Sequence, residues 1–154
     1  MLTPTPTAVA IRLGAKYDER AQERYPAVNV GLSAKHGRFV FSFEDHYKRE
    51  LNFGSVQNAY NVTIGALLVK KKLMFAADFG QFLATKFTNP PEQFQTDLKK
   101  IRDETQWRGA LHYYFRGNIG LLSLVYSDRR LAPNEAGKVT EREHSIKLVA
   151  QYRF

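Results

Sequence analysis

The sequence lacks features that several classes of protein require. None of its 154 residues is cysteine, which excludes a disulfide framework and a thiolate metal site. It has no run of 18 apolar residues, and its mean hydropathy is −0.42, so a helical membrane protein is excluded. A membrane β-barrel is not excluded by this test, because only alternate residues of each strand face lipid.

Residues 1–7 also lack the basic region and the apolar stretch of a secretory signal peptide. An exported protein needs such a signal. We therefore expect a mature form, a form made for refolding, or the C-terminal piece of a longer protein. Residues 1–7 are interpreted as a leader or linker, and 8–154 as one domain.

Positive charge and aromatic side chains are abundant. The formal net charge is +8, from 23 Lys and Arg against 15 Asp and Glu, and 13% of the residues are aromatic. In a soluble protein of this size, such a charge would first indicate nucleic-acid binding. The order of the residues favours another class.

Residues 146–154 alternate between apolar and polar and end on an aromatic residue, whereas chain ends are usually polar and frayed. The same period of two, typical of strands, recurs along the chain. It predicts eight strands, each about long enough to cross a bilayer when tilted. They lie at 9–18, 28–35, 39–44, 60–68, 73–80, 107–116, 121–126 and 146–154.

The connections between these segments are predicted to alternate in length. Tight turns are expected at 36–38, 70–72 and Gly117–Asn118. Longer polar loops are expected at 18–27, 48–57, 85–106 and 128–142. In the loop 85–106, Phe94, Leu98 and Ile101 recur with a helical period, which predicts a short amphipathic helix there. It would pack on the barrel rim or fold into a channel mouth.

The two faces of the predicted strands differ. Most of the Leu, Ile and Phe residues share one face, whereas the other mixes small residues with long charged ones, which cannot pack a dry core. Aromatic side chains near the strand ends suit the two membrane interfaces. We expect this role for Tyr17, Phe39, Tyr60, Trp107, Tyr126, Tyr152 and Phe154.

The charged face is predicted to line a lumen. Its expected members are Arg12, Lys16, Lys35, Glu44, Asp78, Arg108, His112, Arg116, Lys147 and Arg153, with Asp18 as a further acid. Cations outnumber acids in this set. An eight-stranded barrel is only wide enough for side chains to fill it, and unpaired cations there would be costly. Either the barrel is wider and hydrated, with more strands than this chain supplies, or acids such as Glu19, Glu50, Glu141 and Glu143 fold back to pair with these cations.

The terminal segment, with Tyr152 and Phe154 on the matching positions, resembles the C-terminal insertion signal of Gram-negative outer-membrane β-barrels. Residues 106–154 resemble the final three strands of the phosphate-selective porin family, whose members are trimeric anion channels with basic lumens. This resemblance implies lumen positions for Arg116, Lys147 and Arg153. It also implies contact with the barrel-assembly machinery through the last strand, and a homo-oligomer. No motif for the family's narrow lysine ring matches.

The histidines do not indicate a metal site or a catalytic pair. His36, His46, His112 and His144 lack the spacing of a zinc site, and His144 and Ser145 would face opposite sides of a strand. An outer-membrane lipid-modifying enzyme, a soluble barrel that binds nucleic acid and a lipocalin-like carrier are the remaining rivals. Basic residues assigned to the loops, namely Arg20, Arg24, Lys48, Arg49, Arg129 and Arg130, would contact lipopolysaccharide or be simply solvated.

The sequence therefore predicts an all-β, up-and-down antiparallel transmembrane barrel of the bacterial outer membrane. Eight strands lie in this chain, which could be the C-terminal part of a larger barrel. The predicted function is passive, anion-biased passage of small solutes, with no catalysis, no metal or other cofactor, and no nucleic acid. The alternative is a closed eight-stranded barrel with a structural or adhesion role through its loops.

Overall fold

The computed structural model describes residues 7–19, 24–51, 54–70, 72–84, 102–115, 120–133 and 140–152. These residues form eight β-strands. The strands are β1 (Thr7–Glu19), β2 (Arg24–His36), β3 (Phe39–Glu50), β4 (Ser55–Val69), β5 (Leu73–Ala84), β6 (Glu104–Phe115), β7 (Gly120–Leu131) and β8 (Glu141–Tyr152).

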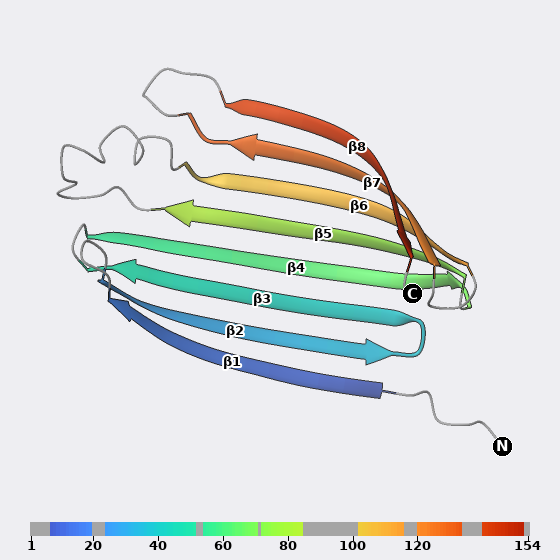
Figure 1. The fold of residues 1–154 in the computed structure, drawn as a ribbon, viewed down its shortest axis with the longest axis horizontal. Helices are drawn as coiled ribbons and strands as arrows, with labels where there is room; N and C mark the ends of the chain where they lie inside the picture. The colour runs from blue at the N-terminus through green and yellow to red at the C-terminus, as the bar shows by residue number, and fades with distance from the viewer. Residues whose placement is uncertain are drawn as a thin grey trace.

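All eight strands belong to one sheet, in which each strand pairs antiparallel with the next in sequence (Figure 1). The predicted all-β class, strand number and up-and-down order are confirmed. Successive hairpins place the β2–β3, β4–β5 and β6–β7 connections at one end of the sheet, where β1 begins and β8 ends. We call this the turn end and the opposite end the loop end.

The predicted turns at 36–38 and 70–72 are confirmed. Gly37, between β2 and β3, has a φ of 57°, which glycine adopts without strain and which matches the twist of a two-residue hairpin. In the β4–β5 turn, the Lys72 amide donates a hydrogen bond to the Val69 carbonyl at 3.0 Å. The turn expected at Gly117–Asn118 lies outside the described residues.

The predicted strand ends near the loop end are wrong, because the strands run on beyond the apolar alternation. β3 continues to Glu50 rather than 44, and β8 begins at Glu141 rather than 146. The connections expected at 18–27 and 48–57 shrink to 20–23 and 51–54, as short as those of the turn end. The longer ones shrink to 85–103 and 132–140. Backbone pairing continues here between residues that are polar on both faces, so the apolar period no longer marks the strand.

The helix predicted within 85–106 falls mainly on residues 85–101, which lie outside the described residues. No helix in the described ranges is both long enough and apolar enough to cross a membrane.

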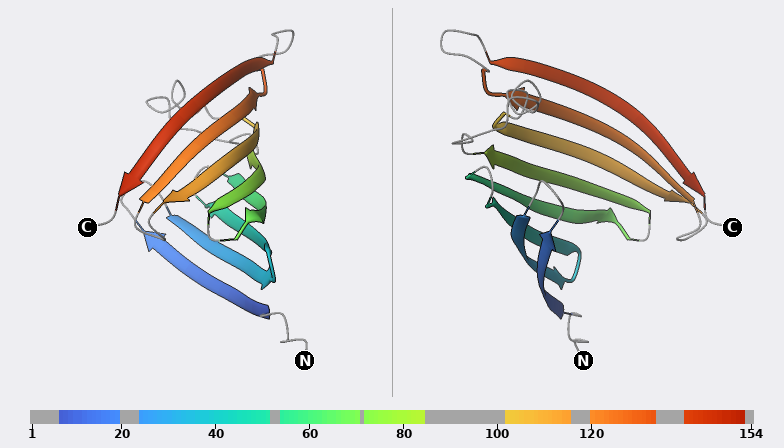
Figure 2. Two further views of the ribbon diagram at one scale, coloured as in Figure 1. Left: turned by 90° about the vertical axis from the view of Figure 1, so that its right-hand side faces the viewer. Right: turned by 60° about the vertical axis from the view of Figure 1, so that its left-hand side comes forward.

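The sheet curves into an arc that stays open (Figure 2). Within the described residues, contacts join only strands that are consecutive in sequence, so β1 and β8 do not meet. The closed barrel predicted from the sequence is therefore not formed within this chain. Both edge strands are left with one side that no strand covers.

The cross-strand register sorts the side chains into two faces. On one face, Val9, Leu32, Phe41 and Ile64 belong to adjoining strands, and many of the large apolar side chains there are 37% to 78% exposed. Leu131 is the one hydrophobic residue, among those the structure describes, that is buried. The described residues thus form an exposed apolar face rather than an apolar core.

Candidate functional site

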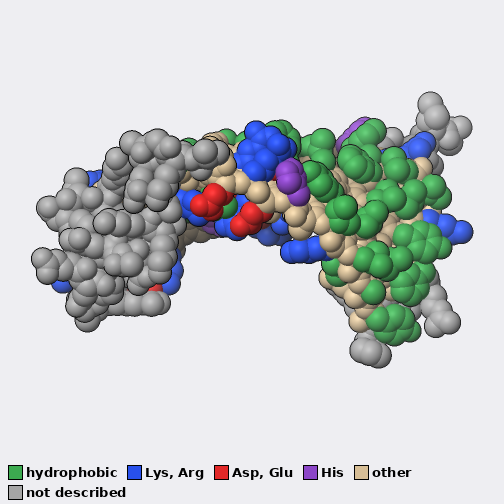
Figure 3. All heavy atoms as spheres, turned by 90° about the horizontal axis from the view of Figure 1, so that it is seen from above, with side chains coloured by type: hydrophobic (Ala, Val, Ile, Leu, Met, Phe, Trp, Pro, Cys, Tyr) green, Lys and Arg blue, Asp and Glu red, His purple; other side chains and the backbone are tan. Residues whose placement is uncertain are grey.

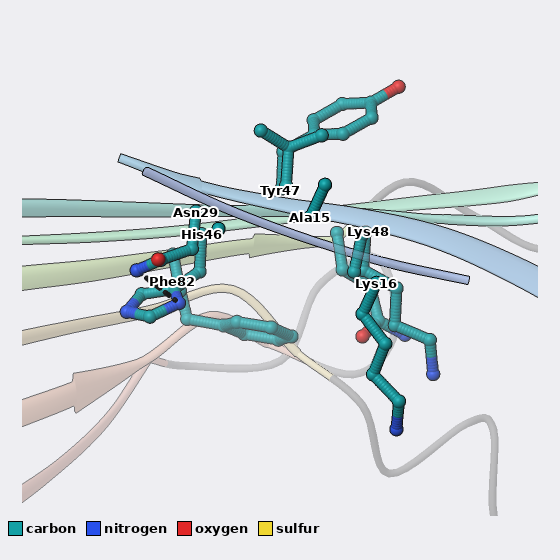
Figure 4. Close-up of a pocket in the computed structure, with 12 residues that line it drawn as sticks. Ala15, Lys16, Asn29, His46, Tyr47, Lys48 and Phe82 are labelled. Carbon is teal, nitrogen blue, oxygen red and sulfur yellow. Dashed lines mark hydrogen bonds between the residues drawn. The ribbon is translucent and has the colours of Figure 1, made fainter. Parts of the chain in front are cut away.

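The polar face of the sheet is its concave face. Two surface hollows open on it, one lined by Lys16, Asn29 and Lys48 among others and the second by Lys35 and Thr63 among others. In the first hollow, Lys16, Lys48 and His46 point to one side of the ribbon, whereas Tyr47 points to the other (Figure 4).

The structure places the described residues of the predicted lumen set on this one face. Gly31 on β2 lies opposite Arg12 on β1 and opposite Glu44 on β3, so all three share a face. Asp78 on β5 lies directly opposite Arg108 on β6. The set comprises Arg12, Lys16, Lys35, Glu44, Asp78, Arg108, His112 and Lys147. Arg116 and Arg153 lie outside the described residues.

Small residues give the long side chains of this face room to extend. An atom at the Cβ position of Gly31 would lie 3.5 Å from the Cβ of Arg12 and 3.8 Å from Cγ of Glu44. Both are ordinary contact distances, so the side-chain stems of Arg12 and Glu44 are not crowded at Gly31. This packing explains the mixture of very small and long charged residues in the sequence.

Three charge contacts lie on this face, one near the middle of β5 and β6 and two where β1, β2 and β3 approach the loop end. The Arg108 Nε donates to both carboxylate oxygens of Asp78, at 2.8 and 3.0 Å. The Lys16 Nζ donates to Asp18 at 2.9 Å, and the Tyr25 hydroxyl donates to the same carboxylate at 3.0 Å. Lys48 covers the ring of Tyr25 with its Nζ 4.0 Å from the centroid. The sequence did not indicate this Tyr25 cluster, which joins three strands.

A second group of ion pairs lies near the loop end. The Arg129 guanidinium bridges Glu104 at 2.6 Å and Glu143 at 3.3 Å, and so ties β6, β7 and β8 together. Arg102, just before β6, pairs with Glu141 at 2.9 Å. The hydrogen bond that Arg102 donates to Glu141 raises the pKa of Arg102 above its ordinary value.

Strand residues beyond the predicted set change the balance of charge on this face, within the described residues. Its bases are Arg12, Lys16, Lys35, Lys48, Arg108, Arg129 and Lys147, and its acids, equal in number, are Asp18, Glu44, Glu50, Asp78, Glu104, Glu141 and Glu143. The additional acids come from strand extensions that the sequence analysis assigned to loops. Glu50, Glu141 and Glu143 thus reach this face, but Glu141 and Glu143 form ion pairs with Arg102 and Arg129, which are not members of the predicted lumen set.

These acids do not neutralise every cation. Glu141 and Glu143 pair with arginines near the loop end, and the buried Glu50 accepts a hydrogen bond from the Arg24 amide at 3.1 Å. Within the part of the chain that the structure describes, Arg12, Lys35 and Lys147 have no ion-pair partner. All three are exposed on the concave face.

Lys48 and Arg129, which the sequence analysis placed in loops, are strand residues of this face. Polar residues at every second position, as in His46-Tyr47-Lys48, were a usable signal. It was missed because the intervening residues are not consistently apolar.

Two of the histidines, His112 and His144, lie within hydrogen-bonding distance of hydroxyl groups on β7. His112 Nδ1 lies 2.8 Å from the Ser123 hydroxyl, on the same face. No three His, Asp or Glu side chains gather as a metal-binding group in the ranges that the structure describes.

The predicted interface aromatics lie on the opposite, convex face. Tyr17, Trp107 and Tyr126 lie toward the loop end and are 47% to 59% exposed. Tyr60, Phe79 and Trp107 form a run across β4, β5 and β6, with ring centroids 6.0 and 4.4 Å apart. Phe39 and Tyr152 lie toward the turn end, 65% and 49% exposed, and Phe154 is outside the described residues.

Comparison of the chain with protein-family models, with curated proteins and with solved structures finds no match.

Proposed function

We propose that this chain forms part of the wall of a β-barrel in a bacterial outer membrane, and that the barrel passes small solutes with a preference for anions. The observation that carries the proposal is the inverted distribution of side chains. Large apolar residues are exposed on the convex face, whereas charged residues gather on the concave face.

Exposed apolar side chains occur on every strand of the sheet. On β1, Ile11 and Leu13 are 70% and 78% exposed, and on β8, Ile146 and Leu148 are 74% and 70% exposed. Soluble proteins rarely leave so extended an apolar surface uncovered. Contact with hydrocarbon would account for it, and aromatic residues at both margins suit headgroup regions of lipid and lipopolysaccharide.

The anion preference is supported by Arg12, Lys35 and Lys147. Each acid named above on the concave face has a basic or amide partner, whereas these three cations have none among the described residues. In a hydrated lumen, unneutralised cations attract anions and repel cations.

A closed eight-stranded barrel with no conducting path is the other candidate. It would require β1 to pair with β8, and no such pairing occurs among the described strands. The open arc therefore favours a wider barrel.

Conductance in a planar bilayer tests the proposal. We expect discrete current steps whose reversal potential in a salt gradient indicates anion selectivity. Replacing Lys35 and Lys147 with glutamate should move this potential toward cation selectivity. Arg49→Glu is the matched control, because Arg49 lies on the convex face of β3 and its charge would not reach the lumen.

Two outcomes would contradict the proposal. A folded, detergent-dependent protein that gives no current would support the non-conducting barrel. Equal shifts of the reversal potential from the Lys35 and Lys147 replacements and from Arg49→Glu would show that Lys35 and Lys147 do not line the lumen.

A further inference from the structure

The two free edges of the sheet complement each other. β1 has 13 residues and β8 has 12. Because the strands alternate in direction and their number is even, β8 and a following β1 would run antiparallel, as every other pair in the sheet does. Joined in this way, their apolar residues would continue one convex face.

In a bilayer these edges have to be covered. Backbone N–H and C=O groups without partners cost several kcal/mol each in hydrocarbon. In the described ranges, β1 and β8 have no strand beyond them, and the arc holds them apart (Figure 2). The four most exposed large apolar side chains among the described residues lie on these two strands: Leu13, Ile146, Ile11 and Leu148.

We infer that a second copy of this chain covers both edges: β8 of each copy pairs with β1 of the other, and two copies close one barrel. This inference rests on the proposed membrane location. Two open arcs joined head to tail form a ring when the rotation between them closes. Two copies of eight strands give a barrel of sixteen, which encloses an aqueous channel, whereas eight strands leave room only for side chains.

The distribution of charge favours a second copy over closure of the chain on itself. Among the described bases of this face, those with neither an ion pair nor an aromatic contact are Arg12 on β1, Lys35 on β2 and Lys147 on β8, all on or next to the two free edges. Closing eight strands would crowd them in a narrow interior, where unpaired charge is costly. In a barrel closed by two copies, these cations would lie in a hydrated lumen.

The joint between copies also completes a site that neither copy has alone. Lys147 of one copy would come beside the strands that carry Arg12 and Lys35 of the other. Their ladder neighbours are small or apolar: Ala8 opposite Lys35, Gly31 opposite Arg12 and Val125 opposite Lys147. Each joint would therefore form a basic strip along the lumen wall, suited to small inorganic anions.

Disulfide trapping tests this arrangement, because the chain has no cysteine of its own. Ala10→Cys on β1 would be combined in turn with Ser145→Cys, Val149→Cys or Gln151→Cys on β8, all on the concave face. After oxidation in lipid vesicles, we expect at least one pairing to give a species of twice 17.7 kDa that reductant converts to monomer.

Two control pairs calibrate the trapping. Ser127→Cys with Ser145→Cys should link within one chain, because the native hydroxyl oxygens are 2.7 Å apart across β7 and β8. Ser33→Cys with Ser127→Cys should not link, because β2 and β7 are separated in one copy and in the proposed pair.

The outcomes separate this inference from the pore. An intrachain link between β1 and β8, ladders of three or more copies, or no link at any pairing would each overturn the two-copy barrel. Anion-selective current from a species that does not link as a dimer would support the pore and contradict the two-copy barrel. Linked dimers that carry no current would support the two-copy barrel and contradict the pore.

Discussion

Near the turn end the two faces of the sheet differ in polarity, whereas near the loop end both faces are polar. β3 passes through both regions. Phe39, Phe41 and Phe43 lie on its convex face near the turn end, followed there by Asp45, Tyr47 and Arg49. Figure 3 shows the same change over the molecule, with hydrophobic side chains gathered toward the turn end and charged ones farther along.

The two regions are stabilised by different interactions. Near the turn end, small residues of the concave face pack closely beneath an exposed apolar belt. Near the loop end, ion pairs join neighbouring strands, including Arg142 of the convex face, which donates to both oxygens of Asp128 at 3.0 and 2.7 Å. The sheet is therefore longer than its apolar belt. In a membrane, its loop end would extend into headgroups and water.

The largest expected effect comes from a charge in the middle of the belt. Ile64→Arg should destabilise the protein in lipid vesicles by about 2–4 kcal/mol, the cost of arginine at a bilayer midplane. Thr63→Arg, one residue away on the concave face, is the matched control and should cost much less. Urea unfolding in vesicles measures both, and equal losses would contradict lipid contact at Ile64.

A smaller effect should separate Gly65, on the concave face near the turn end, from Gly109, on the convex face of β6. A Cβ on Gly65 would lie 2.7 Å from Cγ2 of Val40, whereas one on Gly109 meets nothing within 4 Å. Gly65→Val should therefore cost about 1–3 kcal/mol through overpacking, and Gly109→Val should be nearly neutral. The same unfolding experiment compares them. The reverse order would mean that the concave face is loosely packed.

The smallest effect is expected at the loop end. Arg129→Gln removes the bridge between Glu104 and Glu143, but the guanidinium is 38% exposed, so water screens the loss. We expect a change of about 1 kcal/mol or less, reduced further in high salt. Arg49→Gln, a convex residue of β3, serves as the control. A loss as large as that of Ile64→Arg would show that the loop-end ion pairs dominate stability.

The candidate site was predictable in part, for identifiable reasons. Arg108 and Asp78 could be assigned to one face from the period of two alone, because alternation is a local property of a strand. Their direct pairing depends on the register of β5 against β6, which the sequence does not express. Lys48 and Arg129 were missed because the alternation around them no longer separates apolar from polar residues.

By itself, the sequence determined the number of strands, their antiparallel order and the sorting of side chains into an apolar and a charged face. Only the tertiary structure decided how far the strands extend, which charges neutralise one another and that the sheet stays open within this chain. The reason is physical: alternation is set within one strand, whereas ion pairs depend on register between strands. Closure depends on curvature accumulated over all eight of them.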